Sequence, residues 1–387
     1  MKKNLCILGS TGSVGSQALE VADELGIKVG AISGNSRVAF LESQVRKFKP
    51  EFAVAYDENN ARELKIKVRD TSTKVLYGME GLCEICQANG IDMVITAISG
   101  LNGLIPTLSA IDAGKTIGLA NKETLVAGGK HVMKRAREKN VDIIPIDSEH
   151  SAIFQCLKAS QNKKEIKKLI LTASGGPFFQ KPINELENVS IKETLAHPNW
   201  NMGAKITVDS ATMINKGLEL IEAMYLFDVP ESKIDVIVHR ESVVHSMVQY
   251  KDNSIIAQMA VPDMKIPIQY AMTYPERKNS KVKELNLCDY QNLSFYKPGA
   301  FASKSLKIAR DAAVFGEVAM ITLNCANEEA VDMFLNGKIR FTDILDVVQV
   351  CIDYFTNQNI KISCPEDILN LSYNIKNFIK STYTNIV

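Results

Sequence analysis

The chain has 387 residues and a net charge of +1, from 45 Lys and Arg against 44 Asp and Glu. This balance argues against a nucleic-acid-binding surface, and no apolar run approaches the ~20 residues that cross a bilayer. The hydrophobic fraction of 46% is typical of a globular protein, and the length predicts two or three domains.

The first part of the chain alternates strands with helices such as Val38–Phe48 and Lys122–Lys139. Continuous apolar strands between helices predict a parallel sheet covered on both faces, a Rossmann-like domain over residues 1–149. Such sheets bind ligands beyond the carboxyl ends of their strands. The expected strands are Asn4–Leu8, Lys28–Ser33, Phe52–Tyr56, Lys74–Tyr77, Met93–Ile98, Thr116–Ala120 and Val141–Ile146.

The remaining chain predicts an α/β catalytic domain over 150–275, a polar linker over 276–300 and a helical domain over 301–387. In the catalytic domain we expect helices Ser151–Lys158 and Ala211–Leu226, and strands Lys168–Thr172, Asp235–His239, Ser242–Gln249 and Ser254–Met259. In the C-terminal domain, helical spacing of apolar residues marks Ile308–Ala319, Glu328–Leu335 and Ile344–Phe355.

The eight cysteines are scattered, and most lie in apolar segments. Cys83 and Cys86 form an isolated C-x-x-C pair, without a second pair or a nearby histidine to complete a zinc site. We therefore expect reduced cysteines in a cytoplasmic protein. The apolar run after the basic N-terminus stops at Gly9, too short for the ~7–15-residue core of a signal peptide.

Three glycines, Gly9, Gly12 and Gly15, follow the first expected strand and open the first helix. Glycines let the backbone approach a pyrophosphate, whose charge a helix N-terminus favours, so this loop predicts a dinucleotide site. The alternative is a tight turn without a ligand. The second strand ends in Gly34-Asn35-Ser36-Arg37, with a cation and no acid, which favours NADP(H) over NAD. Arg37 could instead be a solvated residue of the next helix.

Two acids, Asp147 and Glu149, end the last strand of the predicted sheet. Oxygen ligands at this spacing can share one Mg²⁺ or Mn²⁺ ion, although Asp147 could simply cap the following helix.

Glu219 is a third candidate ligand, on a helix that we expect Asp209 and Ser210 to cap. Asn215, Lys216 and Glu219 share one face of this helix. A buried acid there needs a partner, and a metal shared with Asp147 and Glu149 would supply one. A surface ion pair between Lys216 and Glu219 is the alternative.

A phosphate pocket is expected where Ser174-Gly175-Gly176-Pro177 ends a strand. A hydroxyl and flexible backbone N–H groups form an anion cradle, and Ser210, Asn215 and Lys216 could complete it. A Gly-Gly-Pro turn without a ligand is equally compatible with this sequence. Trp200, the only tryptophan, lies nearby in an aperiodic segment, which suggests a loop that covers a ligand.

These motifs occur in an order that closely resembles the 1-deoxy-D-xylulose 5-phosphate reductoisomerase family, nearly from end to end. The His197–Glu219 segment is the most specific of them. The motifs are Gly9–Gly15, Leu119–Glu123, Asp147–Glu149, Leu171–Phe178 and His197–Glu219.

The resemblance implies conversion of 1-deoxy-D-xylulose 5-phosphate to 2-C-methyl-D-erythritol 4-phosphate by retro-aldol and aldol rearrangement and reduction by NADPH. It also implies a homodimer, and a divalent cation (Mg²⁺ or Mn²⁺, with Co²⁺ as a further candidate) on Asp147, Glu149 and Glu219. Positions matching substrate contacts are Lys122, Ser148, Glu149, Ser174, His197, Trp200, Met202, Ser210, Asn215, Lys216 and Glu219; of these, Lys122, Glu149, His197 and Glu219, together with Asp147, form the expected catalytic set. Positions matching cofactor contacts are Thr11, Gly12, Ser13, Val14, Gly34, Asn35, Ser36, Asn121, Glu123, Gly203, Pro262 and Met264, to which the cation argument adds Arg37.

One position departs from the family pattern. Many relatives carry a long polar or basic residue after Gly203, and Ala204 stands there in this chain, which puts the contact of the lid with the cofactor phosphates in question.

Two other functions compete with the resemblance. A semialdehyde-type dehydrogenase needs a nucleophilic cysteine at a helix N-terminus, but Cys156 and Cys325 are flanked by helix-interior residues. A non-catalytic NADP sensor would have no use for three metal-binding acids.

Overall fold

The computed structural model describes residues 3–160, 162–200 and 202–383. Asn201, inside the predicted lid, and residues 384–387 lie outside the described residues. The chain forms two compact units: Met1–Thr124, Lys130–Ser151 and Asp263–Val282 make the N-terminal unit, and Leu125–Gly129, Ala152–Pro262 and Lys283–Val387 make the C-terminal unit. This division groups 263–282 with the first sheet, whereas the domain limits at 149, 275 and 300 stay predictions.

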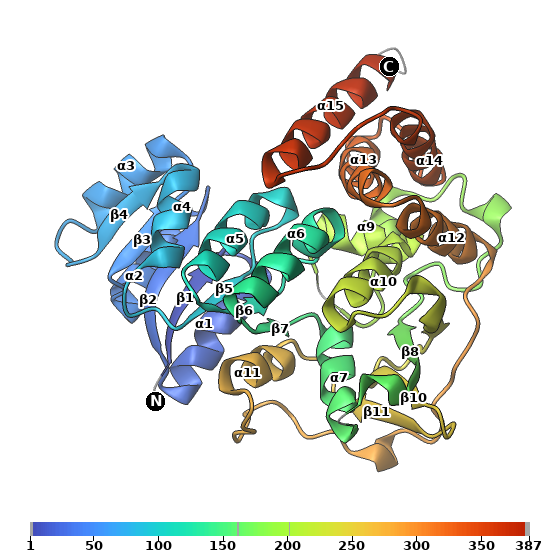
Figure 1. Ribbon diagram of the computed structural model, residues 1–387, viewed down its shortest axis with the longest axis horizontal. Helices are drawn as coiled ribbons and strands as arrows, with labels where there is room; N and C mark the ends of the chain where they lie inside the picture. Colours follow the sequence, from blue (N-terminus) through green and yellow to red (C-terminus); the bar gives the residue numbers. More distant parts are fainter. Residues whose placement is uncertain (1–2, 161, 201, 384–387) are drawn as a thin grey trace. The chain divides into compact units, whose positions relative to one another are not determined.

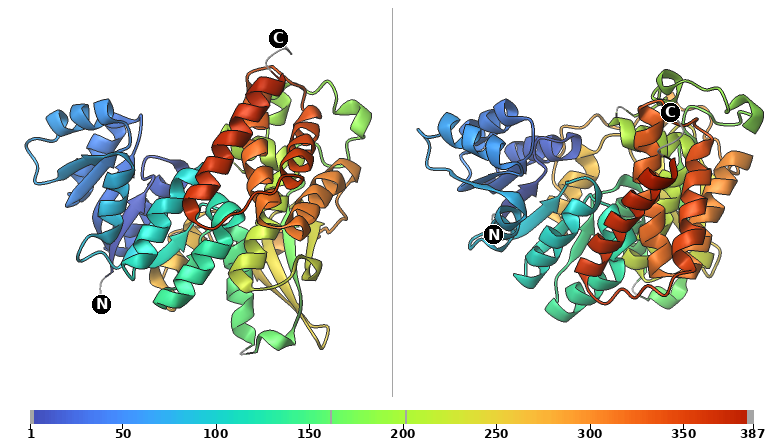
Figure 2. Two further views of the ribbon diagram at one scale, coloured as in Figure 1. Left: turned by 45° about the horizontal axis from the view of Figure 1, so that its top comes forward. Right: turned by 90° about the horizontal axis from the view of Figure 1, so that it is seen from above.

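The N-terminal unit is a parallel seven-stranded sheet in the order β4-β3-β2-β1-β5-β6-β7, with helices on both faces (Figures 1 and 2). The Rossmann-like fold and all seven strands are confirmed. The strands are β1 (Asn4–Leu8), β2 (Lys28–Gly34), β3 (Phe52–Ala55), β4 (Lys74–Tyr77), β5 (Met93–Thr96), β6 (Thr116–Leu119) and β7 (Ile143–Pro145). The helices are α1 (Ser13–Leu25), α2 (Val38–Phe48), α3 (Glu58–Lys67), α4 (Gly78–Gln87), α5 (Leu104–Asp112) and α11 (Lys265–Thr273).

The central strand of this sheet is β1, where the strand order changes direction between β2 and β5. Its residues Leu5–Leu8 are fully buried, because helices cover both faces. This burial explains the continuous apolar run in the sequence. The change of direction is the topological switch point at which such sheets bind ligands, and it places the Gly9–Gly15 loop there.

The C-terminal unit contains a mixed four-stranded sheet in the order β11-β10-β8-β9. β10 is antiparallel to both of its neighbours, whereas β8 and β9 are parallel. The carboxyl ends of β8 and β9 therefore lie at the same edge of the sheet. The strands are β8 (Ile166–Ala173), β9 (Ile234–Val238), β10 (Val244–Tyr250) and β11 (Ile255–Met259).

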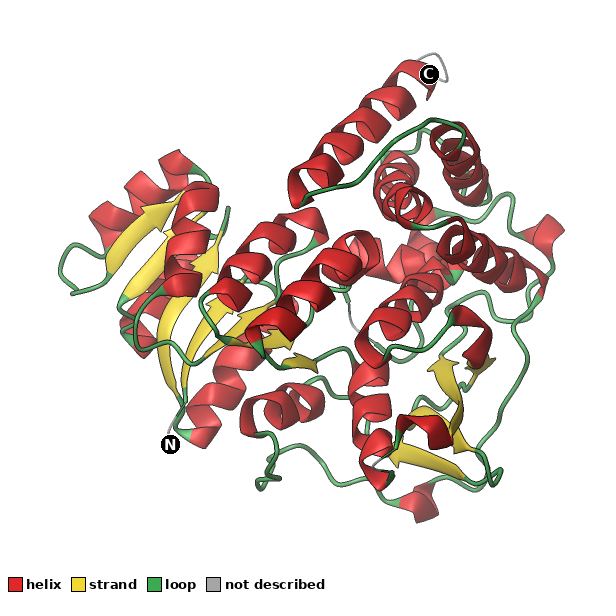
Figure 3. Ribbon diagram, in the orientation of Figure 1, coloured by secondary structure: helices red, strands yellow, loops and turns green. Residues whose placement is uncertain are grey.

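Helices complete this unit and join it to the first. α6 (Glu123–Lys139) and α7 (Ser148–Cys156) each contain residues of both units. The helical C-terminal part is confirmed, but the predicted helix Ile308–Ala319 is wrong in its limits, because Gly316 has a φ of +100° and ends one helix before the next begins. Residues 276–299, most of the predicted linker, are largely loop (Figure 3). The remaining helices are α8 (Ile191–Thr194), α9 (Ala204–Thr212), α10 (Ile214–Phe227), α12 (Ala300–Phe315), α13 (Glu317–Leu335), α14 (Asp343–Thr356) and α15 (Pro365–Tyr383).

The predicted helix Ala211–Leu226 is also wrong, because two helices, α9 and α10, meet within it. Met213 joins them with a left-handed φ of +66°. Asp209 therefore lies inside α9 rather than at a helix start, where it is buried and accepts a hydrogen bond from Asn327 at 2.8 Å. Met213 is the N-cap of α10 and has no side-chain cap, while the hydroxyl of Thr212 before it accepts the N–H of Ile214 at 3.3 Å.

Among the described helices, none combines the length and apolarity needed to cross a membrane.

Candidate active site

The glycine loop after β1 packs closely against its own backbone and that of the loop after β5. Gly9 has a φ of +79°, and a Cβ there would lie 2.5 Å from the Ala97 carbonyl oxygen. A Cβ on Gly15 would lie 2.1 Å from the Gly9 carbonyl oxygen. Gly12 is the N-cap of α1 and brings no side chain onto the first N–H groups of the helix. The helix start, with Thr11, Ser13 and Val14 around it, thus fits an anion.

Arg37 is exposed, but its side chain is bonded to this loop. Its Nη1 donates to the carbonyl oxygen of Thr11 at 2.6 Å, and its guanidinium lies 4.9 Å from the ring centroid of Phe40. Asn35 and Ser36 are exposed beside it, and a Cβ on Gly34 would meet the Thr11 side chain at 2.9 Å. The structure thus holds a guanidinium in a defined place at the end of β2, where a 2′-phosphate would be recognised.

Asn121 ties together the loops that follow β5 and β6. Its Nδ2 donates to the carbonyl oxygens of Ile98 and Gly100, the latter at 2.9 Å, and its Oδ1 accepts the N–H of Thr124 at 2.7 Å. These bonds give Asn121 a structural role. Its contact with a cofactor, like that of Glu123, stays a prediction.

Met264 belongs to the N-terminal unit although it lies far along the chain from the glycine loop. It is the N-cap of α11, which packs against α1. Lys265 bonds Glu20 of α1 at 2.7 Å and fixes this packing. The predicted cofactor residue Met264 therefore begins a helix that is anchored to the helix of the glycine loop.

Asp147 both caps α7 and forms an ion pair with Lys122. Its Oδ1 accepts the N–H groups of Glu149 at 3.1 Å and His150 at 3.4 Å, and lies 3.0 Å from His150 Nδ1. Its Oδ2 accepts a hydrogen bond from Lys122 Nζ at 3.1 Å, in surroundings where the two side chains are 10% and 8% exposed. Ser148 Oγ donates to the Glu149 carboxylate. The capping role and a ligand role are thus compatible, because they use different oxygens.

The Ser174 loop continues β8 and contacts α9. Gly175 and Gly176 both have left-handed φ, at +78° and +64°. A Cβ on Gly176 would lie 2.8 Å from the Ser210 carbonyl oxygen, so the structure brings this loop against the predicted phosphate residue of α9. Ser174 Oγ accepts the N–H of Gly176 at 3.2 Å.

His197 connects the lid to this loop in one defined tautomer. Its Nδ1 accepts two backbone N–H groups, from Asn199 at 3.2 Å and Trp200 at 3.0 Å. Nδ1 must then be unprotonated, so the proton of the neutral ring is on Nε2, which donates to Ser174 Oγ at 2.9 Å. Burial lowers the pKa of His197 to about 4, and the charge of Arg240 adds to this effect.

The rest of the predicted lid leads directly into α9. Trp200 and Met202 are half-buried, and the ring centroid of Trp200 lies 6.5 Å from that of His245. Gly203 is the N-cap of α9, with no side-chain cap, so the helix start next to Ala204 offers its backbone N–H groups.

One face of α10 presents the predicted phosphate and metal residues together. Asn215 Nδ2 and Lys216 Nζ each donate to one carboxylate oxygen of Glu219, both at 2.5 Å. Lys216 and Glu219 are 4% and 1% exposed. The ion pair that the sequence offered as an alternative is therefore present, but it is buried rather than at the surface. The predicted metal ligands are divided between the units, with Asp147 and Glu149 in the first and Glu219 in the second.

Two residues near this site, Arg240 and His245, carried no sequence motif, and Asn199 lies in the His197–Glu219 motif but was given no role. Arg240 donates to the Ser174 loop, Asn199 donates to the Arg240 carbonyl oxygen and to Ser242, and His245 is buried in β10 beside Trp200. Arg240 follows the predicted strand Asp235–His239, so the rule that ligands bind at the carboxyl ends of strands could have indicated it. Nothing in the sequence distinguishes His245 from a core residue.

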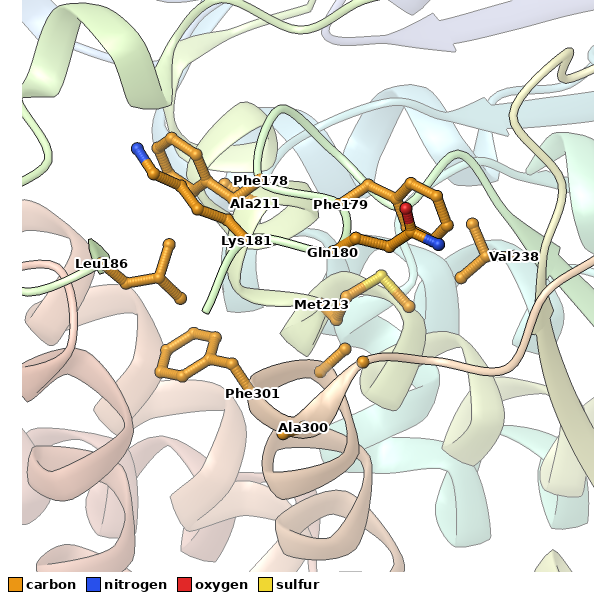
Figure 4. A pocket seen from close by; sticks show the side chains of 13 residues that line it. Phe178, Phe179, Gln180, Lys181, Leu186, Ala211, Met213, Val238, Ala300 and Phe301 are labelled. Carbon is orange, nitrogen blue, oxygen red and sulfur yellow. The ribbon is translucent and has the colours of Figure 1, made fainter. Parts of the chain in front are cut away.

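A small pocket in the C-terminal unit borders the Ser174 loop through Gly175 (Figure 4). The other residues of its lining are mostly apolar, and the predicted site side chains do not line it. The lining includes Phe178, Phe179, Leu186, Met213, Val238 and Phe301.

The two cysteines considered for the semialdehyde-dehydrogenase alternative, Cys156 and Cys325, are buried. Burial raises the pKa of Cys156 to about 11 and that of Cys325 to about 12, so neither provides a thiolate nucleophile near neutral pH. All eight cysteines are free thiols.

Comparison with known families matches three regions of the chain. Residues 5–129 match the family model 1-deoxy-D-xylulose 5-phosphate reductoisomerase, and residues 143–227 match the C-terminal domain of that enzyme. Residues 259–378 match a DXP reductoisomerase C-terminal domain.

Relatives of known name and structure match over the full length. The chain is 46% identical to 1-deoxy-D-xylulose 5-phosphate reductoisomerase of Clostridium novyi, covering 98% of this chain and 99% of the relative, and 47% identical to that of Clostridium kluyveri, covering 99% and 100%. A crystal structure of DOX-P reductoisomerase with NADPH, fosmidomycin and magnesium is 43% identical, with a TM-score of 0.93 and coverage of 99% and 98%. The Zymomonas mobilis enzyme in complex with NADPH is 34% identical, with a TM-score of 0.92 and full coverage of both chains.

The buried side chain of His245 predicts how the free energy of unfolding depends on pH. Burial lowers the pKa of His245 to about 4, against about 6.5 in an unfolded chain. Between these values the unfolded state binds a proton that the folded state does not, so stability falls as the pH drops from 6.5 toward 4. In urea unfolding, His245→Gln should reduce the loss between pH 7 and pH 4.5 by roughly 2 kcal/mol. Equal losses in the variant and the wild type would contradict the assignment.

Proposed function

The chain belongs to the 1-deoxy-D-xylulose 5-phosphate reductoisomerase family, and we propose that the residues described above form its catalytic site. The enzyme converts 1-deoxy-D-xylulose 5-phosphate to 2-C-methyl-D-erythritol 4-phosphate in the non-mevalonate isoprenoid pathway. It depends on NADPH and a divalent cation. The ketose is first rearranged to an isomeric branched aldehyde, which then takes up a hydride and a proton, leaving NADP⁺.

The continuity of His197–Glu219 is the observation that supports this site most strongly. The segment begins with a histidine bonded to Ser174, passes Ser210 against the same loop, and ends with Asn215, Lys216 and Glu219 on one face of α10. A sugar phosphate needs a cation and hydroxyl donors at its phosphate, and carboxylates for the metal at its other end. This one segment supplies both kinds of group.

The residues of the N-terminal unit fit the cofactor. Gly9 and Gly15 let the loop pack against its own backbone, and Gly12, as the N-cap of α1, leaves the first N–H groups of the helix without a side-chain cap, which suits a pyrophosphate. Arg37 would hold the 2′-phosphate, since its guanidinium is held in place by the Thr11 carbonyl oxygen.

The donor set also fits a divalent cation. Asp147, Glu149 and Glu219 offer only oxygen atoms, which suit Mg²⁺ or Mn²⁺. Lys122 next to Asp147 and Lys216 next to Glu219 limit the excess negative charge of these acids. When bound, the cation supplies Lewis acidity for the rearrangement, and NADPH supplies the hydride.

The residues of the chain bind, orient and enclose the substrate. Lys216, with Ser174, Ser210 and Asn215, would hold the phosphate. Ser148 and Lys122 would contact the reacting end, where Lys122 Nζ can donate a hydrogen bond to a substrate oxygen. His197, with its proton on Nε2, would remain a neutral donor throughout the neutral pH range, because its pKa is near 4.

Trp200 and Met202 would cover the site and exclude water. Gly203, at the start of α9, would contact the cofactor through its backbone.

We also propose a homodimer and a cytoplasmic location. β11 is an edge strand that exposes Ile255 and Ile256, as expected of a surface that pairs with a second copy. The eight free thiols suit a reducing compartment. A single-chain mass in sedimentation velocity would refute the dimer, and recovery outside the cytoplasmic fraction of cells would refute the location.

The decisive assay follows NADPH absorbance with 1-deoxy-D-xylulose 5-phosphate, with and without Mg²⁺. We expect Glu219→Gln to lower kcat by at least a hundredfold, because it removes a charged metal ligand, and to leave the Kd of NADPH within twofold. Asp209→Asn is the matched control, because Asp209 is an equally buried acid on the preceding helix. It should lower stability but retain metal-dependent turnover. Near-normal activity of Glu219→Gln would exclude the metal assignment.

Arg37 predicts a preference between cofactors. NADPH should outperform NADH in kcat/KM by at least a hundredfold in the wild type, because only NADPH carries the 2′-phosphate. Arg37→Ala should raise the KM of NADPH about tenfold and leave that of NADH nearly unchanged. Similar effects of the substitution on both cofactors would show that Arg37 supports the loop without recognising the phosphate.

A further inference from the structure

Arg240 lies directly behind the Ser174 loop, in the turn that follows β9. Its Nη1 donates to the carbonyl oxygens of Ser174 at 2.6 Å and Gly176 at 2.8 Å. Its guanidinium lies 5.1 Å from the ring centroid of Phe179, within the range of a cation–π contact. One side chain thus holds both ends of the Ser174–Gly176 loop.

The two carbonyl oxygens matter because this loop is expected to face a phosphate dianion. A carbonyl oxygen that points toward a phosphate repels it, whereas backbone N–H groups and a hydroxyl attract it. By accepting from Arg240, the carbonyls of Ser174 and Gly176 are kept on the side of the loop that faces the guanidinium. The left-handed φ values of Gly175 and Gly176 permit the turn that this requires.

The acid next to Arg240 is directed elsewhere. Glu241 accepts a hydrogen bond from Ser294 Oγ at 2.6 Å and lies 3.0 Å from His239 Nδ1. The positive charge of Arg240 is therefore placed against the loop, where it also favours an anion on the other side.

The same turn also holds the lid. Asn199 Nδ2 donates to the carbonyl oxygen of Arg240 at 2.7 Å and to Ser242 Oγ at 2.8 Å. Two residues earlier, His197 bonds Ser174. The turn therefore contacts the loop through the Arg240 side chain and the lid through the Arg240 backbone.

We propose that Arg240 is a positioning residue for the substrate phosphate: it orients the Ser174–Gly176 loop so that its donors face the dianion. The inference rests on the proposed function, which places the phosphate at Ser174. It predicts that loss of the guanidinium weakens binding of phosphate-bearing ligands more than it slows the chemical steps.

The test measures the KM for 1-deoxy-D-xylulose 5-phosphate and the inhibition constant of a phosphonate hydroxamate, set against kcat and the Kd of NADPH. Arg240→Met should raise the first two at least tenfold, with kcat within threefold and the NADPH Kd within twofold. Arg240→Lys should recover part of the loss, because it restores the charge but not the planar group.

Arg310→Met is the matched control. Arg310 also donates to two backbone carbonyl oxygens, those of Glu231 and Ile234, but it does so at the opposite end of β9. All four quantities should stay within twofold in this variant.

The proposal fails if Arg240→Met leaves KM and the inhibition constant within twofold of the wild type, or lowers kcat alone. If Arg240→Met does not fold, Arg240→Lys decides, and an unchanged KM in that variant contradicts the proposal. A wild-type enzyme without activity on 1-deoxy-D-xylulose 5-phosphate would instead refute the proposed function, whatever the Arg240 variants show.

Discussion

A buried carboxylate on an apolar helix must be compensated, and Glu219 is compensated by its own helix. With 1% of its surface exposed, it accepts hydrogen bonds from Asn215 and Lys216, one to each oxygen. Removing Lys216 would take away the ion-pair partner of a buried carboxylate, which costs several kcal/mol. The side chains expected to bind phosphate are therefore oriented by the acid expected to bind metal, so neither set can move independently of the other.

Met213, which has a left-handed φ, sets the direction of α10 and therefore of its Asn215–Glu219 face. It ends α9 and starts α10, so the two helices change direction at one residue. α9 packs Ser210 against Gly176, and α10 then carries Lys216 and Glu219. Together with the bond from His197 to Ser174, these contacts connect the proposed lid, the Ser174 loop and the Asn215–Glu219 face of α10.

The sequence predicted what depends on periodicity and on backbone shape. The seven parallel strands appear as apolar runs because both faces of the sheet are buried, and Gly9 and Gly15 stand where a Cβ would collide with backbone atoms. The break at Met213 could not be predicted, because methionine has no preference for positive φ and tertiary packing imposes it. Arg240 stands at the carboxyl end of a predicted strand, which marks it as a candidate, but its bond to the Ser174 loop, far away in the sequence, is visible only in the structure.

Trp200 offers a direct test of whether the proposed lid closes when a ligand binds the Asn215–Glu219 face of α10, because it is the only tryptophan of the chain and lies beside His245. The measurement is its fluorescence emission when a phosphonate hydroxamate is added with Mn²⁺. We expect a clear change in the wild type and a much smaller one in Glu219→Gln, because the ligand must engage the α10 face before the lid closes over it. An unchanged spectrum in the wild type, at ligand concentrations that inhibit the enzyme, would show that the His197–Gly203 segment does not close over the ligand.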